Sequence, residues 1–343
     1  MQDTQLKRVL SPRQVRFIAL GAAIGVGLFL GSASAIKLAG PSVLIAYLFA
    51  GGIIFLIMRA LGELAVDNPV SGSFSTYASR CLGPFAGFLT GWNYWIMNIG
   101  VGIAEITAVG LYMKLWFPDV PQWIWALAAV GMIGALNLIT VKLYGELEFR
   151  FALVKVATMV LLIAGGTAMI VTGWGNGGHP ISVSSLWAHG GWFPHGVSGL
   201  LMSLLISANG VPVRGALLSL ACLLVGVLLN YLAPESVFGW LMALLSFTAI
   251  WTWATVLVTH YRFRVLRKQR NQPAAASPML VWPLSSWIAL LFLAFLICTM
   301  AADGQSRVSL FAGLAWIAFL GVIYKATGLG ASRLPVEDAR SQA

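Results

Sequence analysis

Long stretches without a charged side chain constrain this sequence more than any other feature. Charge-free intervals of 20 residues or more lie at 17–36, 38–58, 81–104, 120–141, 215–234, 236–261 and 271–302, and at 156–213, which is too long for one span. About 20 consecutive apolar residues are enough for an α-helix to cross the hydrocarbon core of a bilayer. Only 9% of the residues are charged, whereas soluble domains have about 25%. We therefore expect an all-α, polytopic membrane helix bundle whose main partner is the lipid bilayer.

The pattern of apolar segments and basic residues predicts about 10 spans. They are expected at 17–36, 43–60, 84–113, 122–140, 150–172, 196–213, 215–232, 237–260, 284–302 and 308–325. The weakest is 196–213, which is apolar over only 12 residues before a turn-like segment. Without this crossing, the basic cluster at 262–270 would lie outside, against the positive-inside rule. With it, we expect a multi-pass protein of the bacterial cytoplasmic (inner) membrane with both termini in the cytoplasm.

Charge and motif content argue against several other functions. The formal net charge is +10, but the basic residues lie at span ends rather than on one soluble face, so no nucleic-acid partner is expected. The three cysteines and the loop histidines lack metal-site spacing. We find no nucleophile elbow, phosphate loop or paired carboxylates. We therefore predict no enzyme, no metal site and no cofactor.

The run GAAIGVGLF (21–29) places three glycines inside the first predicted span. Glycine weakens a helix by about 1 kcal/mol relative to alanine. In hydrocarbon, backbone groups without partners are costly, so an unwound segment persists only where it lines something polar. Transporters bind their substrates at such broken helices. The alternative is a small-residue face for helix packing, which composition alone leaves equally open.

Glu105 is an acid well inside a predicted span. Such a residue costs about 2.5–3.5 kcal/mol to insert and often marks a proton relay. We predict it as the proton-coupling candidate; the alternative is a Glu near the outer interface, bonded to Thr107 or to a neighbouring helix. Asn93 and Tyr94 precede it on the same span and are candidate substrate contacts, although Tyr94, like Trp92 and Trp95, could also serve packing alone.

The connector 59–84 carries Arg59, Glu63, Asp67 and Arg80 around Pro69. Two interpretations remain open from the sequence. The segment is either a cytoplasmic gate or an ordinary amphipathic connector.

Several segments together resemble one family. GAAIGVGLFLGSASAIKLAGPSV (21–43), RALGELAVDNPVSGSFSTYASRCLGP (59–84), AEITAVGLYM (104–113) and KLYGELEFRFALVKV (142–156) are similar to the amino acid transporter family of the amino acid-polyamine-organocation superfamily, close to bacterial proline-specific and neutral amino-acid permeases. The similarity resumes at NGVPVRG (209–215) and continues to about residue 329.

This resemblance implies two inverted five-helix repeats and a substrate site at the broken first helix. The backbone of Ala23, Ile24, Gly25, Val26 and Gly27 would then hold the carboxylate and amino groups of an amino-acid substrate. Glu105 would lie on the third-helix side of the pathway. Protons are implied as a further partner, because members typically couple uptake to them.

The chain also departs from that family pattern. Between Leu205 and Asn209 it lacks most of the sixth helix and all of the seventh and eighth, so we expect a truncated form of the repeat fold. A single membrane-embedded domain over 1–343 would comprise 1–205, the last four helices in 209–329, and a cytoplasmic tail at 330–343. We predict proton-coupled uptake of a neutral, proline-like amino acid; the missing helices weigh against transport. The alternative is a transport-inactive remnant or a regulatory partner of another permease.

Overall fold

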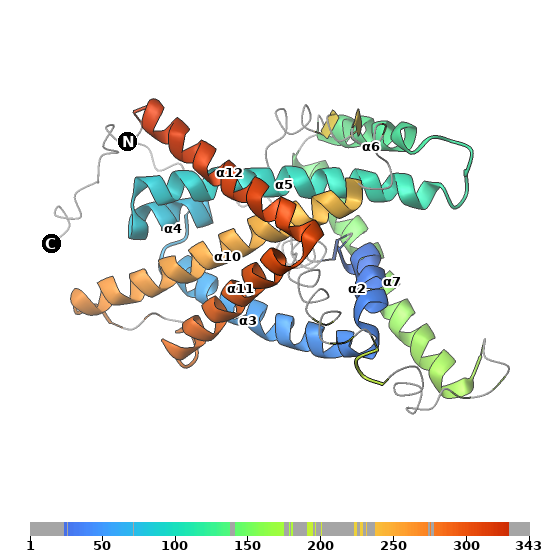
Figure 1. The fold of residues 1–343 in the computed structure, drawn as a ribbon, viewed down its shortest axis with the longest axis horizontal. Helices are drawn as coiled ribbons and strands as arrows, with labels where there is room; N and C mark the ends of the chain where they lie inside the picture. The colour runs from blue at the N-terminus through green and yellow to red at the C-terminus, as the bar shows by residue number, and fades with distance from the viewer. Residues whose placement is uncertain are drawn as a thin grey trace. The chain divides into compact units, whose positions relative to one another are not determined.

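Every regular element that the structure describes is a helix, which confirms the predicted all-α class (Figure 1). The structure is a computed structural model, and within it no strand occurs in the described residues. These are residues 24–25, 27–70, 72–137, 141–174, 178, 180, 191–194, 196, 200, 223–224, 227–228, 231, 237–273, 275 and 278–328.

The chain divides into two compact units. The first comprises 1–50 and 98–242, and the second comprises 51–97 and 243–343. Three helices contribute residues to both units: α3 (Val43–Asp67), α5 (Pro84–Met113) and α10 (Val237–Gln269).

The first unit begins with a short π-helix, η1 (Gly27–Gly31), that continues as α2 (Ser32–Ala39). A 3-10 turn, η2 (Gly40–Ser42), then leads into α3. Gly40 has φ +59°, and a side chain there would collide with Pro194. Glycine adopts this left-handed conformation without steric cost. The break therefore falls at 40–42, inside the interval between the first two predicted spans.

Two further helices of this unit are α6 (Gln122–Asn137) and α7 (Val141–Thr172). None of the most apolar window of α7 is buried, and Leu161 is 71% exposed. The hydroxyls of three exposed threonines on α7 donate to carbonyls of their own helix. The pairs are Thr158 with Val154 at 2.9 Å, Thr167 with Ile163 at 2.8 Å and Thr172 with Ala168 at 2.7 Å.

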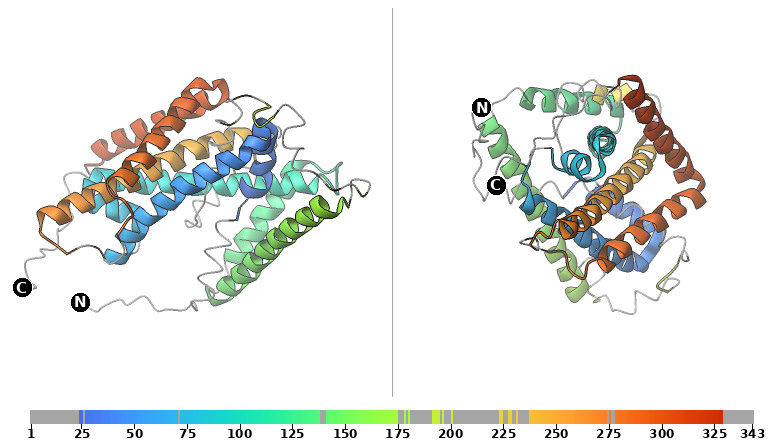
Figure 2. Two further views of the ribbon diagram at one scale, coloured as in Figure 1. Left: turned by 90° about the horizontal axis from the view of Figure 1, so that it is seen from below. Right: turned by 90° about the vertical axis from the view of Figure 1, so that its left-hand side faces the viewer.

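The second unit adds three helices to its parts of α3, α5 and α10 (Figure 2). They are α4 (Ser73–Leu82), α11 (Leu284–Ala302) and α12 (Gly304–Ala326). Gly72, with φ +88°, permits the turn before α4. Between α11 and α12, the Asp303 carboxylate caps α12 by accepting a hydrogen bond from the Ser306 amide at 2.8 Å. Such a cap satisfies a backbone N–H that the first helical turn leaves without a partner.

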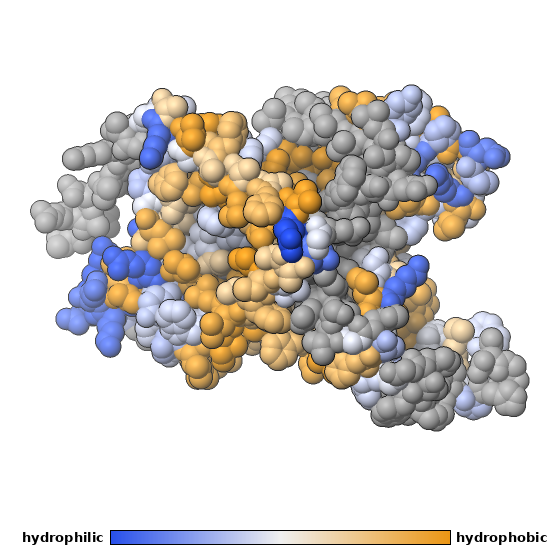
Figure 3. All heavy atoms as spheres, in the orientation of Figure 1, coloured by the Kyte–Doolittle hydropathy of each residue, from blue (hydrophilic) through white to orange (hydrophobic). Residues whose placement is uncertain are grey.

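Helix α10 contacts both α11 and α12 in this unit. Ile250 and Leu257, which lie on it, are 2% and 0% exposed. Its Tyr261 ring lies 5.9 Å from that of Trp287 on α11, and its Phe247 ring lies against Gly313 of α12. Hydrophilic side chains gather at the end of α10, while the flanks of the unit's helices are largely hydrophobic (Figure 3). This pattern suits helices that meet lipid along their sides.

Five helical segments among the described residues are long and apolar enough to cross a membrane: Ser32–Asp67, Pro84–Met113, Glu146–Thr172, Leu284–Ala302 and Ser306–Ala326. Gln122–Leu136 is a shorter apolar helix. These findings confirm a multi-pass helix bundle. The predictions for 84–113 and 284–302 coincide with the observed helices α5 and α11. The count of 10 stays a prediction, because most of 196–213 and of 215–232 lies outside the described residues. The division into 1–205, 209–329 and 330–343 also stays a prediction.

Candidate functional site

The backbone of the glycine-rich run is irregular where the structure describes it. Ile24 and Gly25 form a bend, and the π-helix η1 follows from Gly27. The Leu28 amide donates to the Gly25 carbonyl at 3.1 Å. Ala23 and Val26, which the sequence also singles out, lie outside the described residues.

A π-helical turn changes which backbone groups are paired. Its hydrogen bonds run from residue i to i+5, so the entry into a regular α-helix leaves local donors and acceptors without helical partners. Short π segments of this kind occur frequently at functional sites. At 24–31 the described backbone thus has the irregularity that a broken-helix binding site needs, and the role of its residues in binding stays a prediction.

Asn93 of α5 is fully buried in the second unit and connects α5 to α10. Its amide nitrogen donates to the Thr248 carbonyl and to the Thr252 hydroxyl, each at 3.0 Å. Its Oδ1 is buried and has no hydrogen-bond partner among the described residues. Asn93 therefore has a packing function, and Oδ1 retains the capacity to accept one hydrogen bond from a ligand or water.

Tyr94 follows Asn93 and lies in an aromatic group with rings from two other helices of the same unit. Its ring centroid is 4.9 Å from that of Phe74 on α4, and Phe74 in turn lies 6.1 Å from Trp253 on α10, edge to face. Tilted and edge-to-face pairs at such distances stabilise aromatic clusters. The packing interpretation that the sequence left open for Tyr94 has direct support, while its contact with a substrate stays a prediction.

Glu105 lies in the part of α5 that belongs to the first unit. Its side chain is exposed, whereas those of the neighbouring Ala104 and Ile106 are buried. Lys155 of α7, in the same unit, interacts with it electrostatically. The Thr107 hydroxyl donates instead to the Ile103 carbonyl at 2.7 Å. An acid on a membrane helix thus has a basic counterpart on another helix, as intramembrane charges usually do.

A buried charged cluster forms around Glu63, which the sequence placed only in a connector. The side chain of Glu63 is 1% exposed. Arg264 of α10 holds it in a bidentate arrangement, with Nε to Oε1 and Nη2 to Oε2 both at 2.7 Å. The Met279 amide donates to Oε2 at 2.7 Å, and His260 Nε2 lies 3.0 Å from the same oxygen.

The partners of Glu63 define the hydrogen positions in this cluster. Bidentate pairing with an arginine requires an ionised carboxylate, which has only acceptor sites. His260 Nε2 is therefore the protonated ring nitrogen and donates. His260 Nδ1 is buried and has no partner among the described residues. The guanidinium of Arg264 also lies 5.3 Å from the centroid of the Trp282 ring, within the range of a cation–π contact.

This cluster was missed at the level of sequence, although one signal was present. His260 and Arg264 are four positions apart, so they share one face of a helix. The interval 236–261 is charge-free, and the basic residues beyond it indicate orientation, so neither pattern points to an ion pair. The connector 59–84 is itself mostly helical, since α3 extends to Asp67 and α4 follows at Ser73. The helix that carries the second predicted span, 43–60, therefore continues to Asp67.

Comparison with known proteins decides the family. The profile described as amino acid permease matches residues 14–209 and 205–328, which together cover most of the chain. The chain belongs to the amino acid permease family. The two matched pieces of this family profile meet at 205–209, the position at which the sequence predicts missing helices.

Two relatives extend the comparison across nearly the whole permease length. The chain is 37% identical to the uncharacterized amino acid permease YtnA of Bacillus subtilis (strain 168), with 95% of this chain and 96% of the relative covered. It is 33% identical to the aromatic amino acid transport protein AroP of Escherichia coli (strain K12), with 93% and 95% covered. The alignment with YtnA extends over 445 positions, more than the 343 residues of this chain. More than a hundred of those positions therefore face no residue of this permease-family chain.

Proposed function

We propose that this chain is a secondary active permease that carries a neutral amino acid into the cytoplasm together with protons. The observation that supports this proposal best is the irregular backbone at 24–31 in a chain of the amino acid permease family. The described bend and π-helix are the kind of element that presents free backbone groups to a charged ligand.

The backbone of residues 23–27 would bind the parts that all amino acids share. Backbone N–H groups at a helix start favour the carboxylate, and free carbonyls favour the ammonium group. A neutral side chain is proposed because no charged residue occurs in 17–36. Proline is one candidate substrate, and the name of AroP adds the aromatic amino acids.

Glu105 is proposed to carry the coupled proton. It lies on α5 within electrostatic reach of Lys155 on α7. Protonation of Glu105 would remove one partner of this opposite-charge pair and weaken the attraction between the two helices. A change of that kind is a physical basis for linking proton entry to helix movement.

Uptake of radiolabelled proline, phenylalanine and leucine into a bacterial strain without the corresponding permeases tests this function. Saturable uptake that collapses when the proton gradient is dissipated is expected. Gly27→Val should lower uptake about tenfold or more, because the valine side chain would hold the ligand away from the backbone, and one hydrogen bond to a charged group is worth about 1.5–3 kcal/mol. Gly165→Val on α7 is the matched control, since nothing lies within 4 Å of an added Cβ there. Uptake no higher than in cells with the empty vector would contradict the proposal.

More than a hundred positions of the alignment with YtnA have no counterpart in this chain. Their absence favours one second candidate, a transport-inactive membrane protein that associates with another permease. Under this alternative the purified chain is folded and transports none of the three amino acids. Co-purification with a full-length permease and a change in that permease's uptake rate would support it. Uptake by the purified chain alone in proteoliposomes would exclude it.

A further inference from the structure

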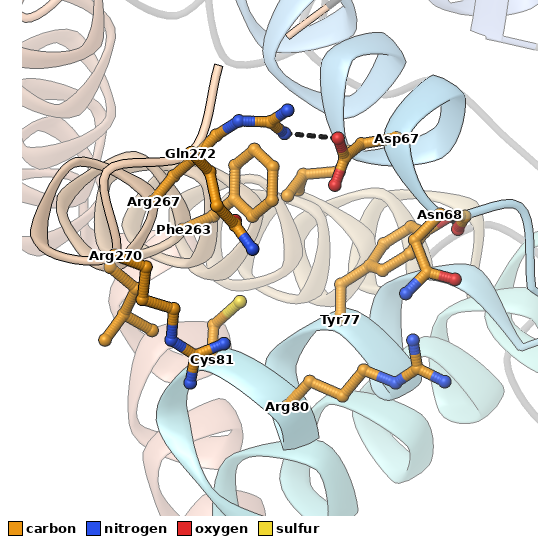
Figure 4. Close-up of a pocket in the computed structure, with 11 residues that line it drawn as sticks. Asp67, Asn68, Tyr77, Arg80, Cys81, Phe263, Arg267, Arg270 and Gln272 are labelled. Carbon is orange, nitrogen blue, oxygen red and sulfur yellow. Dashed lines mark hydrogen bonds and ion pairs between the residues drawn. The ribbon is translucent and has the colours of Figure 1, made fainter. Parts of the chain in front are cut away.

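A second polar site lies at one end of the second unit, apart from the residues proposed for amino-acid binding. It is a pocket of about 270 Å³ between the end of α3, the helix α4 and the end of α10 (Figure 4). Arginines are prominent in its lining, which includes Asp67, Tyr77, Arg80, Cys81, Arg267 and Arg270. We call it the arginine pocket.

One arginine of the arginine pocket is already neutralised. Arg267 forms an ion pair with Asp67, and its guanidinium lies 5.6 Å from the centroid of the Phe263 ring. Figure 4 shows this pair on one wall of the pocket. The pair leaves the remaining lining with an excess of positive charge.

The other two arginines are available for a ligand. Within the part of the chain that the structure describes, neither Arg80 nor Arg270 makes a side-chain hydrogen bond or an ion pair, and both are exposed. Arg270, directly after the end of α10 at Gln269, reaches toward Cys81, while Arg80 on α4 extends toward Asn68 (Figure 4). Two guanidinium groups on separate segments can donate several hydrogen bonds to one multivalent oxyanion.

The position of the arginine pocket suggests the chemistry of this anion. The pocket is at the ends of helices whose flanks are apolar, and Leu64, Phe263 and Leu266 add an apolar wall. The basic residues at 262–270 predict that this end faces the cytoplasm. The cytoplasmic leaflet carries anionic phospholipids, and basic pockets beside membrane helices bind their headgroups.

We propose that the arginine pocket binds a phosphate group, held by Arg80 and Arg270. An anionic phospholipid and free phosphate share this chemistry, and the experiment below separates them. The site is independent of amino-acid transport, so its test does not require a functional carrier.

Cys81 supplies the readout because it lines the arginine pocket. In the full-length chain, Cys222→Ser and Cys298→Ser leave Cys81 as the single thiol. Its rate of reaction with a maleimide is measured in nanodiscs of phosphatidylcholine, with and without phosphatidylglycerol. A third arm adds inorganic phosphate to the phosphatidylcholine nanodiscs, with chloride at equal ionic strength as its control.

Slower labelling with phosphatidylglycerol alone identifies a phospholipid ligand, and slower labelling with inorganic phosphate identifies free phosphate. Arg80→Gln combined with Arg270→Gln should lower the affinity for the protecting ligand about 30-fold, since each basic residue contributes about fivefold to this affinity. Arg262→Gln combined with Lys268→Gln removes the same charge from exposed positions that do not line the pocket, and should preserve protection.

Equal labelling rates in all arms would overturn the proposal, and so would equal loss of protection in the two double variants. The comparison of nanodiscs uses the unaltered arginines, so it is decisive even where a double variant fails to fold. Native mass spectrometry of the purified chain gives a separate measurement, in which bound phosphatidylglycerol is expected and its absence counts against a lipid ligand.

Discussion

Arg264 of α10 donates two hydrogen bonds of 2.7 Å to the carboxylate of Glu63 in α3, which lies 201 positions earlier in the sequence. The pair lies in the second unit with His260 and the Met279 amide at the same carboxylate. Breaking a buried ion pair leaves an uncompensated charge, which is far more costly than losing a surface pair.

Replacing Glu63 by glutamine should therefore destabilise the second unit by about 3 kcal/mol or more. Glutamine keeps the shape of the side chain but removes the charge that Arg264 requires. Unfolding in detergent, followed by tryptophan fluorescence, measures the effect. Glu146→Gln is the matched control, because its pair with Arg150 is an exposed i,i+4 pair worth about 0.3–0.5 kcal/mol. Similar stabilities for the two variants would refute this account of Glu63.

Asn93→Ala should cost about 1–3 kcal/mol of stability. The substitution removes the two hydrogen bonds that Asn93 donates, and a typical intramolecular hydrogen bond contributes about 0.5–1.5 kcal/mol. The Thr252 hydroxyl still donates to the Thr248 carbonyl. The same unfolding measurement applies. Thr158→Val on exposed α7 also removes one hydrogen bond, yet should change stability by less than about 0.5 kcal/mol. A stable Asn93→Ala variant that loses amino-acid binding would instead assign Asn93 to the substrate.

Two glycines of α12 should respond in opposite directions to alanine. A Cβ at Gly313 would collide with the Phe247 ring, so Gly313→Ala should cost about 1–3 kcal/mol by overpacking. At Gly321 the nearest atom, on Phe85, would be 3.9 Å away, and alanine should add up to about 1 kcal/mol through helix propensity. Melting temperatures of both variants test this. A Gly313→Ala variant with an unchanged melting temperature would mean that α12 and α10 do not pack closely at this position.

The reactivity of Cys81 should depend on pH in a defined way. Burial raises the pKa of the Cys81 thiol, while the charges of Arg80 and Arg262 lower it and only partly offset that effect. The thiolate is the reactive form, so the maleimide rate should still be rising at a pH where an exposed cysteine has levelled off. Arg80→Gln should move the midpoint further upward, because a nearby positive charge favours the thiolate. A midpoint that moves downward would contradict this assignment of charge effects.

Helices with strong apolar patterns were predictable from the sequence. The spans expected at 84–113 and 284–302 match α5 and α11, because the hydrophobic requirement of a bilayer is a property of each segment alone. The end of α3 was not predictable in this way. Its last turns contain Glu63, whose burial depends on partners almost two hundred residues away. The hydrophobicity of one segment cannot predict contacts with such distant residues.

The candidate site was also predictable from the sequence only in part. The glycine run predicted irregular backbone, and the bend at Ile24 and Gly25 with the following π-helix agrees with it. For Asn93 the sequence predicted a substrate contact and gave no sign of its packing function, because the bonds to Thr248 and Thr252 come from a helix far along the chain. Whether the residues 23–27 and Glu105 hold substrate and proton stays a prediction.

The self-satisfied threonines of α7 have a consequence for a permease-family chain that lacks over a hundred aligned positions. Each hydroxyl donates to a carbonyl of its own helix, so the exposed flank of α7 presents lipid with hydroxyls whose hydrogen bonds are already made. Acyl chains can then cover this flank at little electrostatic cost.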